Sequence, residues 1–220
     1  MNGLYADSIS KSYEGKAILT DIFLSCQVGE IVGLLGRNGS GKSTMLKIFF
    51  GSIPAEYRFM KIDGIVNGSM FENRNLIGYL PQDSFLPSNL KVRKAISLFC
   101  KSRTEVEELE SEPMLKPILD TKCGDISGGE SRVLEILLVL NSKANYILMD
   151  EPFNGVAPIY KEQIKEWIRA KSNQKGFIIT DHDYENILSA STRLMLMHDG
   201  GTKQLESRSE LVEWGYLRAE

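Results

Sequence analysis

The chain has 220 residues, a formal net charge of −3, 42% hydrophobic residues and 25% charged residues. These values are ordinary for a folded globular protein, and without a basic excess we expect no nucleic-acid partner. The longest unbroken aliphatic run covers only 136–140, whereas a membrane-spanning helix needs roughly 20 apolar residues. The first residues lack the basic start and apolar stretch of a secretory signal, so we expect a cytoplasmic protein.

The first eighty residues carry mostly strand patterns. Apolar and polar residues alternate near the start of the chain, and Glu14-Gly15 interrupts this alternation as a turn. A compact apolar strand then leads into a glycine-rich loop, which is followed by helical periodicity. Turn signals at 63–64 and 67–68 divide the next β-rich segment. We expect strands over about 4–9, 18–26 and 31–35, a helix from about 45, and further strands within 61–80.

The rest of the chain alternates between helix and strand patterns. Residues 90–119 have a helical composition interrupted by Pro113 and Pro117, and their run of glutamates is interpreted as a solvated face. Strands that alternate with helices predict a mainly parallel sheet with helices on both sides. Helices are expected over about 129–140 and 158–171, and strands over 146–149, 177–179 and 194–197.

The strongest motif is the glycine-rich loop between the strand at 31–35 and the helix that follows, which fits GxxxxGK[ST]. Glycines allow successive backbone N–H groups to point at phosphate oxygens, and the helix directs its positive N-terminal end to the same place. Lys42 is expected to reach the outer phosphates of a nucleotide and to assist catalysis, and Ser43 is expected to bind Mg²⁺. A glycine-rich turn without a ligand is the alternative. The expected nucleotide-binding residues are Gly36, Arg37, Asn38, Gly39, Ser40, Gly41, Lys42, Ser43 and Thr44.

Two acidic residues, Asp150 and Glu151, follow the apolar strand at 146–149. Ligands of parallel sheets gather at the carboxyl ends of the strands, which places Asp150 opposite Ser43 as a second magnesium-binding group. Glu151 would then lie near the γ-phosphate, where it could orient a water molecule and accept its proton. Taken alone, two acids at a strand end are more often a turn or a helix cap.

A second serine-glycine segment lies between these two elements. Ile126-Ser127-Gly128-Gly129-Glu130 precedes an expected helix and closely resembles the signature motif of ATP-binding cassette (ABC) ATPases, usually written LSGGQ. A serine and two glycines at a helix N-terminus form an anion site. Because residues 36–44 already serve one nucleotide, Ser127, Gly128, Gly129 and Glu130 would bind the nucleotide of a partner chain.

The resemblance to ABC ATPases extends from Tyr13 to about Gly201 and implies roles for three further residues. Tyr13 matches the aromatic residue that stacks on adenine, although it could be an ordinary surface or core tyrosine. Gln82 matches the loop glutamine that contacts Mg²⁺ and senses the membrane partner; a solvated loop residue is the alternative. His182 matches the switch histidine at the γ-phosphate, with a strand-end cap as its alternative.

The resemblance also implies the fold and the partners. We expect an α/β protein with a P-loop NTPase core and mainly parallel sheet, an N-terminal antiparallel β subdomain and a small helical subdomain. A single domain is expected over 1–220, with its core at about 1–82 and 127–220 and a reduced helical subdomain at about 83–126. ATP and Mg²⁺ are the expected cofactors. The expected partners are a second cassette, identical or not, and a separate integral membrane subunit that holds the chain on the inner face of the membrane.

The sequence departs from the family pattern in three places. Ala157 stands where the family usually has an aspartate that helps two cassettes communicate, and Glu130 replaces the commoner glutamine. The segment between Gln82 and Ser127 is short, so contacts with a membrane partner are expected to be unusual.

The leading interpretation is an ATPase subunit of a membrane transporter. A soluble ABC ATPase in translation, repair or assembly is the alternative, although this chain lacks the second cassette or the long insertions of such proteins. A regulatory module that hydrolyses ATP poorly is a third class, for which only Ala157 speaks.

Overall fold

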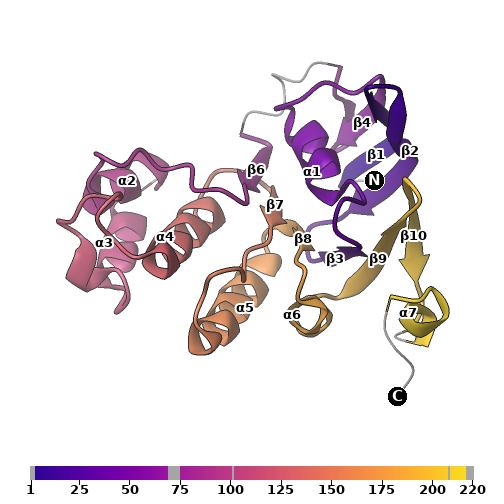
Figure 1. Cartoon of the computed structure of the whole chain (residues 1–220). Helices are drawn as coiled ribbons and strands as arrows, with labels where there is room; N and C mark the ends of the chain where they lie inside the picture. The colour runs from indigo at the N-terminus through magenta and orange to yellow at the C-terminus, as the bar shows by residue number, and fades with distance from the viewer. Residues whose placement is uncertain (1–2, 69–74, 101, 208, 217–220) are drawn as a thin grey trace.

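Two β-sheets and several helices make up the described part of the chain, residues 3–68, 75–100, 102–207 and 209–216, in this computed structural model (Figure 1). The larger sheet contains β3 (Ile31–Gly36), β6 (Ile77–Leu80), β7 (Tyr146–Asp150), β8 (Gly176–Thr180), β9 (Arg193–His198) and β10 (Gly201–Leu205). Its strand order is β10-β9-β3-β8-β7-β6. All neighbours in it pair in parallel except β9 and β10, which are antiparallel. The prediction of a mainly parallel sheet is therefore confirmed.

The smaller sheet lies beside the larger one and is antiparallel throughout. It contains β1 (Leu4–Tyr13), β2 (Lys16–Cys26), β4 (Tyr57–Ile62) and β5 (Ile65–Val66), in the order β2-β1-β4-β5. The turn at Glu14 and Gly15 connects its first two strands, and both residues have positive φ. The expected N-terminal antiparallel region is thus present.

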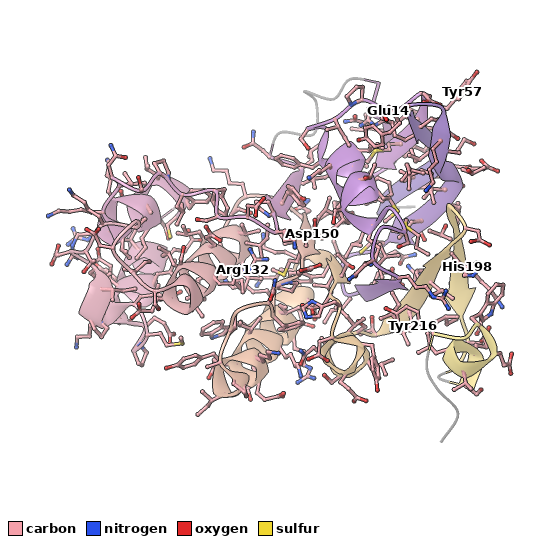
Figure 2. The ribbon with its side chains drawn as sticks, in the orientation of Figure 1. Glu14, Tyr57, Arg132, Asp150, His198 and Tyr216 are labelled. Carbon is pink, nitrogen blue, oxygen red and sulfur yellow. The ribbon has the colours of Figure 1, made fainter. Side chains whose placement is uncertain are left out.

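The helices are α1 (Lys42–Phe50), α2 (Val92–Phe99), α3 (Arg103–Ser111), α4 (Gly128–Leu140), α5 (Pro158–Ser172), α6 (Tyr184–Ala190) and α7 (Ser209–Glu213), with a 3₁₀ turn, η2, at Lys116–Ile118. Helices α2, α3 and the start of α4 form a lobe at one end of the molecule (Figure 1). The carboxyl end of β7, with Asp150, lies between this lobe and the antiparallel sheet (Figure 2). Within the described residues, no helix combines the length and apolarity needed to cross a bilayer.

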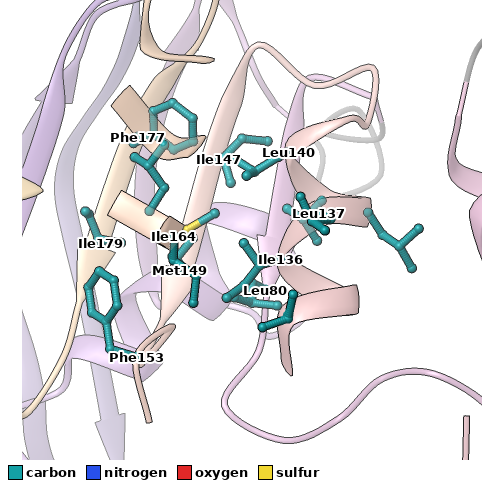
Figure 3. Close-up of a cluster of buried hydrophobic side chains, with 14 of the residues drawn as sticks. Leu80, Ile136, Leu137, Leu140, Ile147, Met149, Phe153, Ile164, Phe177 and Ile179 are labelled. Atoms are coloured by element: carbon teal, nitrogen blue, oxygen red, sulfur yellow. The ribbon is translucent and has the colours of Figure 1, made fainter. Parts of the chain in front are cut away.

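Two hydrophobic clusters cover the two faces of the larger sheet. One cluster holds α1 between the two sheets, with Met45, Leu46 and Phe49 buried against both. The other packs α4, α5 and α6 on the opposite face, and it includes Ile136 of α4, Met149 of β7 and Ile164 of α5 (Figure 3). This second cluster continues into α2 and α3. A continuous apolar core therefore fixes the helical lobe to the edge of the sheet.

Among the glutamates of residues 105–112, Glu107 and Glu108 are exposed and the other three are half-buried, which agrees in part with their interpretation as a solvated face. Ser102 and Glu105 form a capping box at the start of this helix. Three elements were not predicted from the sequence: α6, β10 and α7. They are short, and β10 carries few apolar residues because only one of its side chains, Leu205, is buried. Strand β4 also begins at Tyr57, before the segment in which we expected it.

Candidate functional site

The glycine-rich loop connects β3 to α1, and its geometry is that of an open anion site. Gly41 is the N-cap of α1 with φ 106°, it provides no side-chain cap, and no acidic residue lies in the first turn. The first N–H groups of an α-helix have no partner within the helix, so this end remains available to an anion. Gly39 has φ 78°, and a Cβ added there would meet no atom within 4 Å. The loop therefore borders open space at the point where phosphate oxygens would lie.

Lys42 lies at the start of α1 and is only 8% exposed. Its Nζ donates to the carbonyl of Gly36 at 2.6 Å and to that of Arg37 at 3.2 Å. Burial lowers the pKa of this ammonium, and the nearby carboxylates of Glu151 and Asp150 oppose the shift. The cation is thus placed inside the loop and close to the acidic strand end.

Asp150, at the end of β7, is 1% exposed and receives two side-chain hydrogen bonds. The Ser43 hydroxyl donates to its Oδ1 at 3.0 Å, and the Tyr79 hydroxyl donates to its Oδ2 at 3.2 Å. Burial raises the pKa of Asp150, while these two hydrogen bonds lower it. The sequence places Asp150 opposite Ser43, and the structure brings the two groups into direct contact.

Glu151 follows with φ 53°, in the left-handed region that residues other than glycine rarely adopt. Its Oε2 accepts from Gln82 Nε2 at 3.1 Å and from Asn154 Nδ2 at 3.3 Å. His182 Nδ1 lies 3.8 Å from the same oxygen and 3.4 Å from Oδ1 of the buried Asp181. Residues from three separate parts of the chain therefore surround one carboxylate.

The glycine-rich loop and several of the side chains around Glu151 line one cavity of about 630 Å³. Lys42, Gln82, Glu151 and His182 all line it, and Tyr13 contributes an aromatic ring at its edge. Lys11 Nζ lies 5.2 Å from the centre of that ring. The remaining lining residues are Ile18, Asn38, Gly39, Ser40, Gly41, Ser43 and Thr44. The cavity combines an aromatic ring, a cationic loop and a carboxylate, which suits a molecule with an aromatic base at one end and phosphates at the other.

The serine-glycine segment lies outside this cavity. Ser127 is the N-cap of α4 and forms a capping box with Glu130, whose Oε2 accepts from the Ser127 amide at 2.8 Å and from its hydroxyl at 2.7 Å. These hydrogen bonds lower the pKa of Glu130, so its carboxylate is charged at neutral pH. Ser127 and Gly128 are exposed. The expected second phosphate-binding turn is therefore exposed and does not line the cavity of the chain's own loop.

Sequence reasoning missed several residues at the site. Tyr79 and Arg132 touch the carboxyl end of β7, and Tyr216 exchanges hydrogen bonds with Gly36, its hydroxyl donating to the carbonyl at 3.2 Å and accepting from the amide at 3.3 Å. Arg132 carried a usable signal, because it and Glu135 are the two charged residues in the otherwise apolar stretch 132–140 of α4. Tyr79 and Tyr216 carried none, since single tyrosines have no spacing that reveals a partner far along the chain.

Comparisons with known proteins show which family the chain belongs to. Residues 19–154 match the family described as ABC transporter. The chain is 34% identical to the lipopolysaccharide export system ATP-binding protein LptB of Acidithiobacillus ferridurans, with 96% of this chain and 92% of that protein covered. It is 32% identical to the protein of the same name from Escherichia coli K12, with 91% and 88% covered.

Solved structures agree in fold. An ATP-binding subunit of an ABC transporter superposes with a TM-score of 0.84 at 21% identity, covering 100% of this chain and 95% of that one. A bacterial ABC transporter cassette solved as a dimer superposes with a TM-score of 0.79 at 22% identity, covering 93% and 99%. The family match spans more than half of the chain, and relatives above 30% identity cover nearly all of it. The chain therefore belongs to the ABC transporter family, as an ATP-binding and ATP-hydrolysing subunit of a transporter.

Proposed function

We propose that two cassettes close head to tail around two ATP molecules, that Glu151 is the general base of hydrolysis, and that closure drives a separate integral membrane subunit. The observation that supports this most is the arrangement of the two phosphate-binding turns. One lines a cavity together with Glu151 and His182, whereas the other, at Ser127, is exposed and outside it. In this proposal, a single chain carries two halves of a site that two chains would complete together.

The nucleotide would lie with its base at Tyr13 and its phosphates on the loop at 36–44. Backbone amides at the start of α1 and the Lys42 ammonium would hold the β- and γ-phosphates. Lys42 now donates to two loop carbonyls, and rotation of its flexible stem is all that a phosphate contact requires. Tyr13 is 47% exposed, which leaves ring surface for a base.

A magnesium ion fits the donor set at the end of β7. Asp150 is a buried carboxylate whose charged form is disfavoured by burial, and a dication would stabilise it. Within the described residues, no group of three or more His, Cys, Asp or Glu side chains could form a metal cage. Magnesium usually takes one or two carboxylates together with phosphates and water, and Ser43, Gln82 and Asp150 are the residues that would hold it. The ion would supply charge neutralisation at the phosphates.

Hydrolysis then needs positioning and charge stabilisation and no covalent intermediate. Glu151 would orient a water molecule for in-line attack on the γ-phosphorus and accept its proton as the bond to the ADP oxygen breaks. Gln82 and Asn154 donate to Oε2 of this carboxylate and fix its orientation. His182 lies beside the same oxygen and would contact the γ-phosphate.

Closure would place Ser127–Glu130 of one chain on the γ-phosphate held by its partner. The exposed N-terminus of α4 offers backbone N–H groups to an anion, and a related cassette was solved as a dimer. ATP would stabilise the closed pair because only that state satisfies both phosphate shells. We place the chain on the cytoplasmic face of the membrane, through a membrane subunit. The match to transporter relatives over nearly the whole chain favours this over a soluble assembly or translation factor.

Two substitutions test the proposal. Lys42→Ala should abolish ATP binding or hydrolysis, whereas Lys94→Ala, on the exposed side of α2, should change neither. Glu151→Gln should retain ATP binding, lose about 10²–10⁴-fold in rate as expected for a positioned base, and elute as an ATP-dependent dimer. Glu166→Gln provides the matched control, because Glu166 is exposed on α5. An active Glu151→Gln variant that stays monomeric would remove Glu151 from the role of base.

A further inference from the structure

Arg132 is a buried arginine on α4 that touches both chain segments bearing the proposed catalytic groups. It is 6% exposed. Its Nη2 donates to the carbonyl of Asp150 at 2.6 Å and to that of Glu151 at 2.8 Å, while Nη1 donates to the carbonyl of Pro81 at 2.6 Å. Figure 2 shows Arg132 beside Asp150, between α4 and the end of β7. One guanidinium thus joins the segment before Gln82 to the segment that carries Glu151.

Glu135, one helical turn later, completes this arrangement. It is 1% exposed, and its Oε2 lies 3.6 Å from Nη1 of Arg132. Its Oε1 accepts from the Phe85 amide at 3.1 Å and from the Ser84 hydroxyl. Since Arg132 holds the chain just before Gln82 and Glu135 holds it just after, the pair fixes the loop that carries Gln82 from both sides.

The contact with Glu151 explains how a strained backbone is held. A left-handed conformation costs a residue other than glycine free energy, and it persists only where the surroundings fix it. The Glu151 amide donates to the carbonyl of Thr180 at 2.8 Å. The carbonyls on both sides of the Glu151 Cα, those of Asp150 and Glu151, accept from Arg132. Hydrogen bonds from a charged donor are roughly twice as strong as neutral ones, so the backbone on both sides of the Glu151 Cα is held by strong hydrogen bonds.

We propose that Arg132 is a positioning residue for hydrolysis: it holds Glu151 and the Gln82 loop in their working geometry from the helix whose first turn contacts the partner's nucleotide. Ser127 and Arg132 lie on the same helix, so docking of that turn on a partner nucleotide is linked through α4 to the chain's own catalytic carboxylate. This inference rests on the proposed role of Glu151 as general base.

Arg132→Lys is the substitution that tests it. Lysine keeps the positive charge, but one ammonium cannot match a planar fork that reaches three carbonyls on two segments. We expect unchanged nucleotide affinity, measured with a fluorescent ATP analogue, and a kcat about 10–100-fold lower, the cost of a catalytic group misplaced by about 1 Å. Arg169→Lys is the matched control and should leave kcat unchanged. Arg169 is exposed on α5 and also donates to a backbone carbonyl, that of Ser189 on α6.

A double-mutant cycle separates positioning from a merely structural effect. In the Glu151→Gln background, Arg132→Lys should cause no further loss of single-turnover rate, because the group it positions is already gone. A structural defect would instead lower the active fraction equally in both backgrounds. Equal losses in the two backgrounds, or a normal kcat in Arg132→Lys, would overturn the inference.

Glu135→Gln protects the test against poor folding of the arginine variant. Glutamine keeps an acceptor oxygen for Phe85 and removes only the charge that pairs with Arg132. A several-fold lower kcat that again disappears in the Glu151→Gln background supports the inference; a normal or additive effect contradicts it. If Glu151→Gln alone keeps the full rate, the proposed role of Glu151 as base is wrong. If Glu151→Gln is slow but Arg132→Lys has a normal rate, Glu151 keeps that role and only the positioning role of Arg132 is wrong.

Discussion

Replacing Ala157 by aspartate should stabilise the protein by adding the missing cap to α5. Ala157 is the exposed N-cap of this helix with φ −62° and ψ 145°, it makes no side-chain cap hydrogen bond, and the first turn contains no acidic residue. Aspartate is among the best N-cap residues and adopts this extended backbone without strain. Ala157 also stands at the position where the ABC ATPase family usually has an aspartate.

The magnitude follows from how many amides remain to be capped. Pro158 occupies the first helical position and has no N–H, while the amides of Tyr160 and Lys161 donate to the Ala157 carbonyl at 2.9 and 3.3 Å. Ile159 is therefore the main amide that a side-chain cap would gain. This favours the lower part of the usual range, about 0.5–1 kcal/mol, with about 0.3–1 kcal/mol more from a negative charge at the helix N-terminus. The total of about 1–2 kcal/mol corresponds to a Tm increase of roughly 2–8 °C, because each kcal/mol raises Tm by about 2–4 °C in a chain of this size.

Thermal unfolding of Ala157→Asp and Ala157→Asn between pH 3 and pH 8 checks this reasoning. An Asp carboxylate that accepts a hydrogen bond has a folded pKa below its unfolded value of about 3.9. Its stabilisation is therefore complete above that value and lost as the pH falls through the folded pKa. Asparagine should supply the hydrogen bond without the charge and show no such pH dependence. A Tm that does not rise in either variant at pH 7 would refute the capping argument.

Three further substitutions concern the nucleotide site. Tyr79→Phe removes a donor to Asp150, so the pKa of this buried carboxyl should rise further. Because a protonated carboxyl binds Mg²⁺ poorly, the Mg²⁺ concentration for half-maximal ATPase rate should rise about 5–10-fold, most at acidic pH. Tyr216→Phe leaves the Gly36 amide and carbonyl without the hydroxyl and should lower stability by about 1 kcal/mol in chemical denaturation. Glu130→Gln keeps the capping box and removes a charge beside the proposed partner phosphate. Its ATP-dependent dimer should be tighter by up to about 1 kcal/mol in analytical ultracentrifugation.

The parts of the site that local sequence determines were predictable. A phosphate loop is a contiguous segment, so its glycines, Lys42 and Ser43 can be recognised without knowing what packs on them. Asp150 and Glu151 could be placed because parallel strands bring their carboxyl ends to one edge, and the 3.0 Å contact from Ser43 to Asp150 agrees with that rule. His182 follows β8, the neighbour of β7 in the sheet, for the same reason.

The supporting contacts were not predictable because they join backbone carbonyls, which every residue has, to side chains far along the chain. Nothing in the sequence around Pro81 indicates that Arg132 binds its carbonyl, 51 residues away. Tyr216 reaches Gly36 across 180 residues, and only the folded path of α7 brings them together. The left-handed backbone of Glu151 could not be predicted from the sequence either, since glutamate rarely adopts positive φ.

Helix α4 contains both a motif that local sequence reveals, at Ser127 and Gly128, and a supporting residue that only the fold reveals, Arg132. Every residue from Arg132 to Leu140 is buried, whereas Ser127 and Gly128 at its start are exposed. A helix buried on all sides over its last nine residues is fixed to the sheet by the apolar core, so its exposed first turn is presented at a defined place. Because Arg132 lies at the boundary between these two parts and binds the carbonyls around Glu151, a buried helix rather than a loop joins the exposed turn to the end of β7.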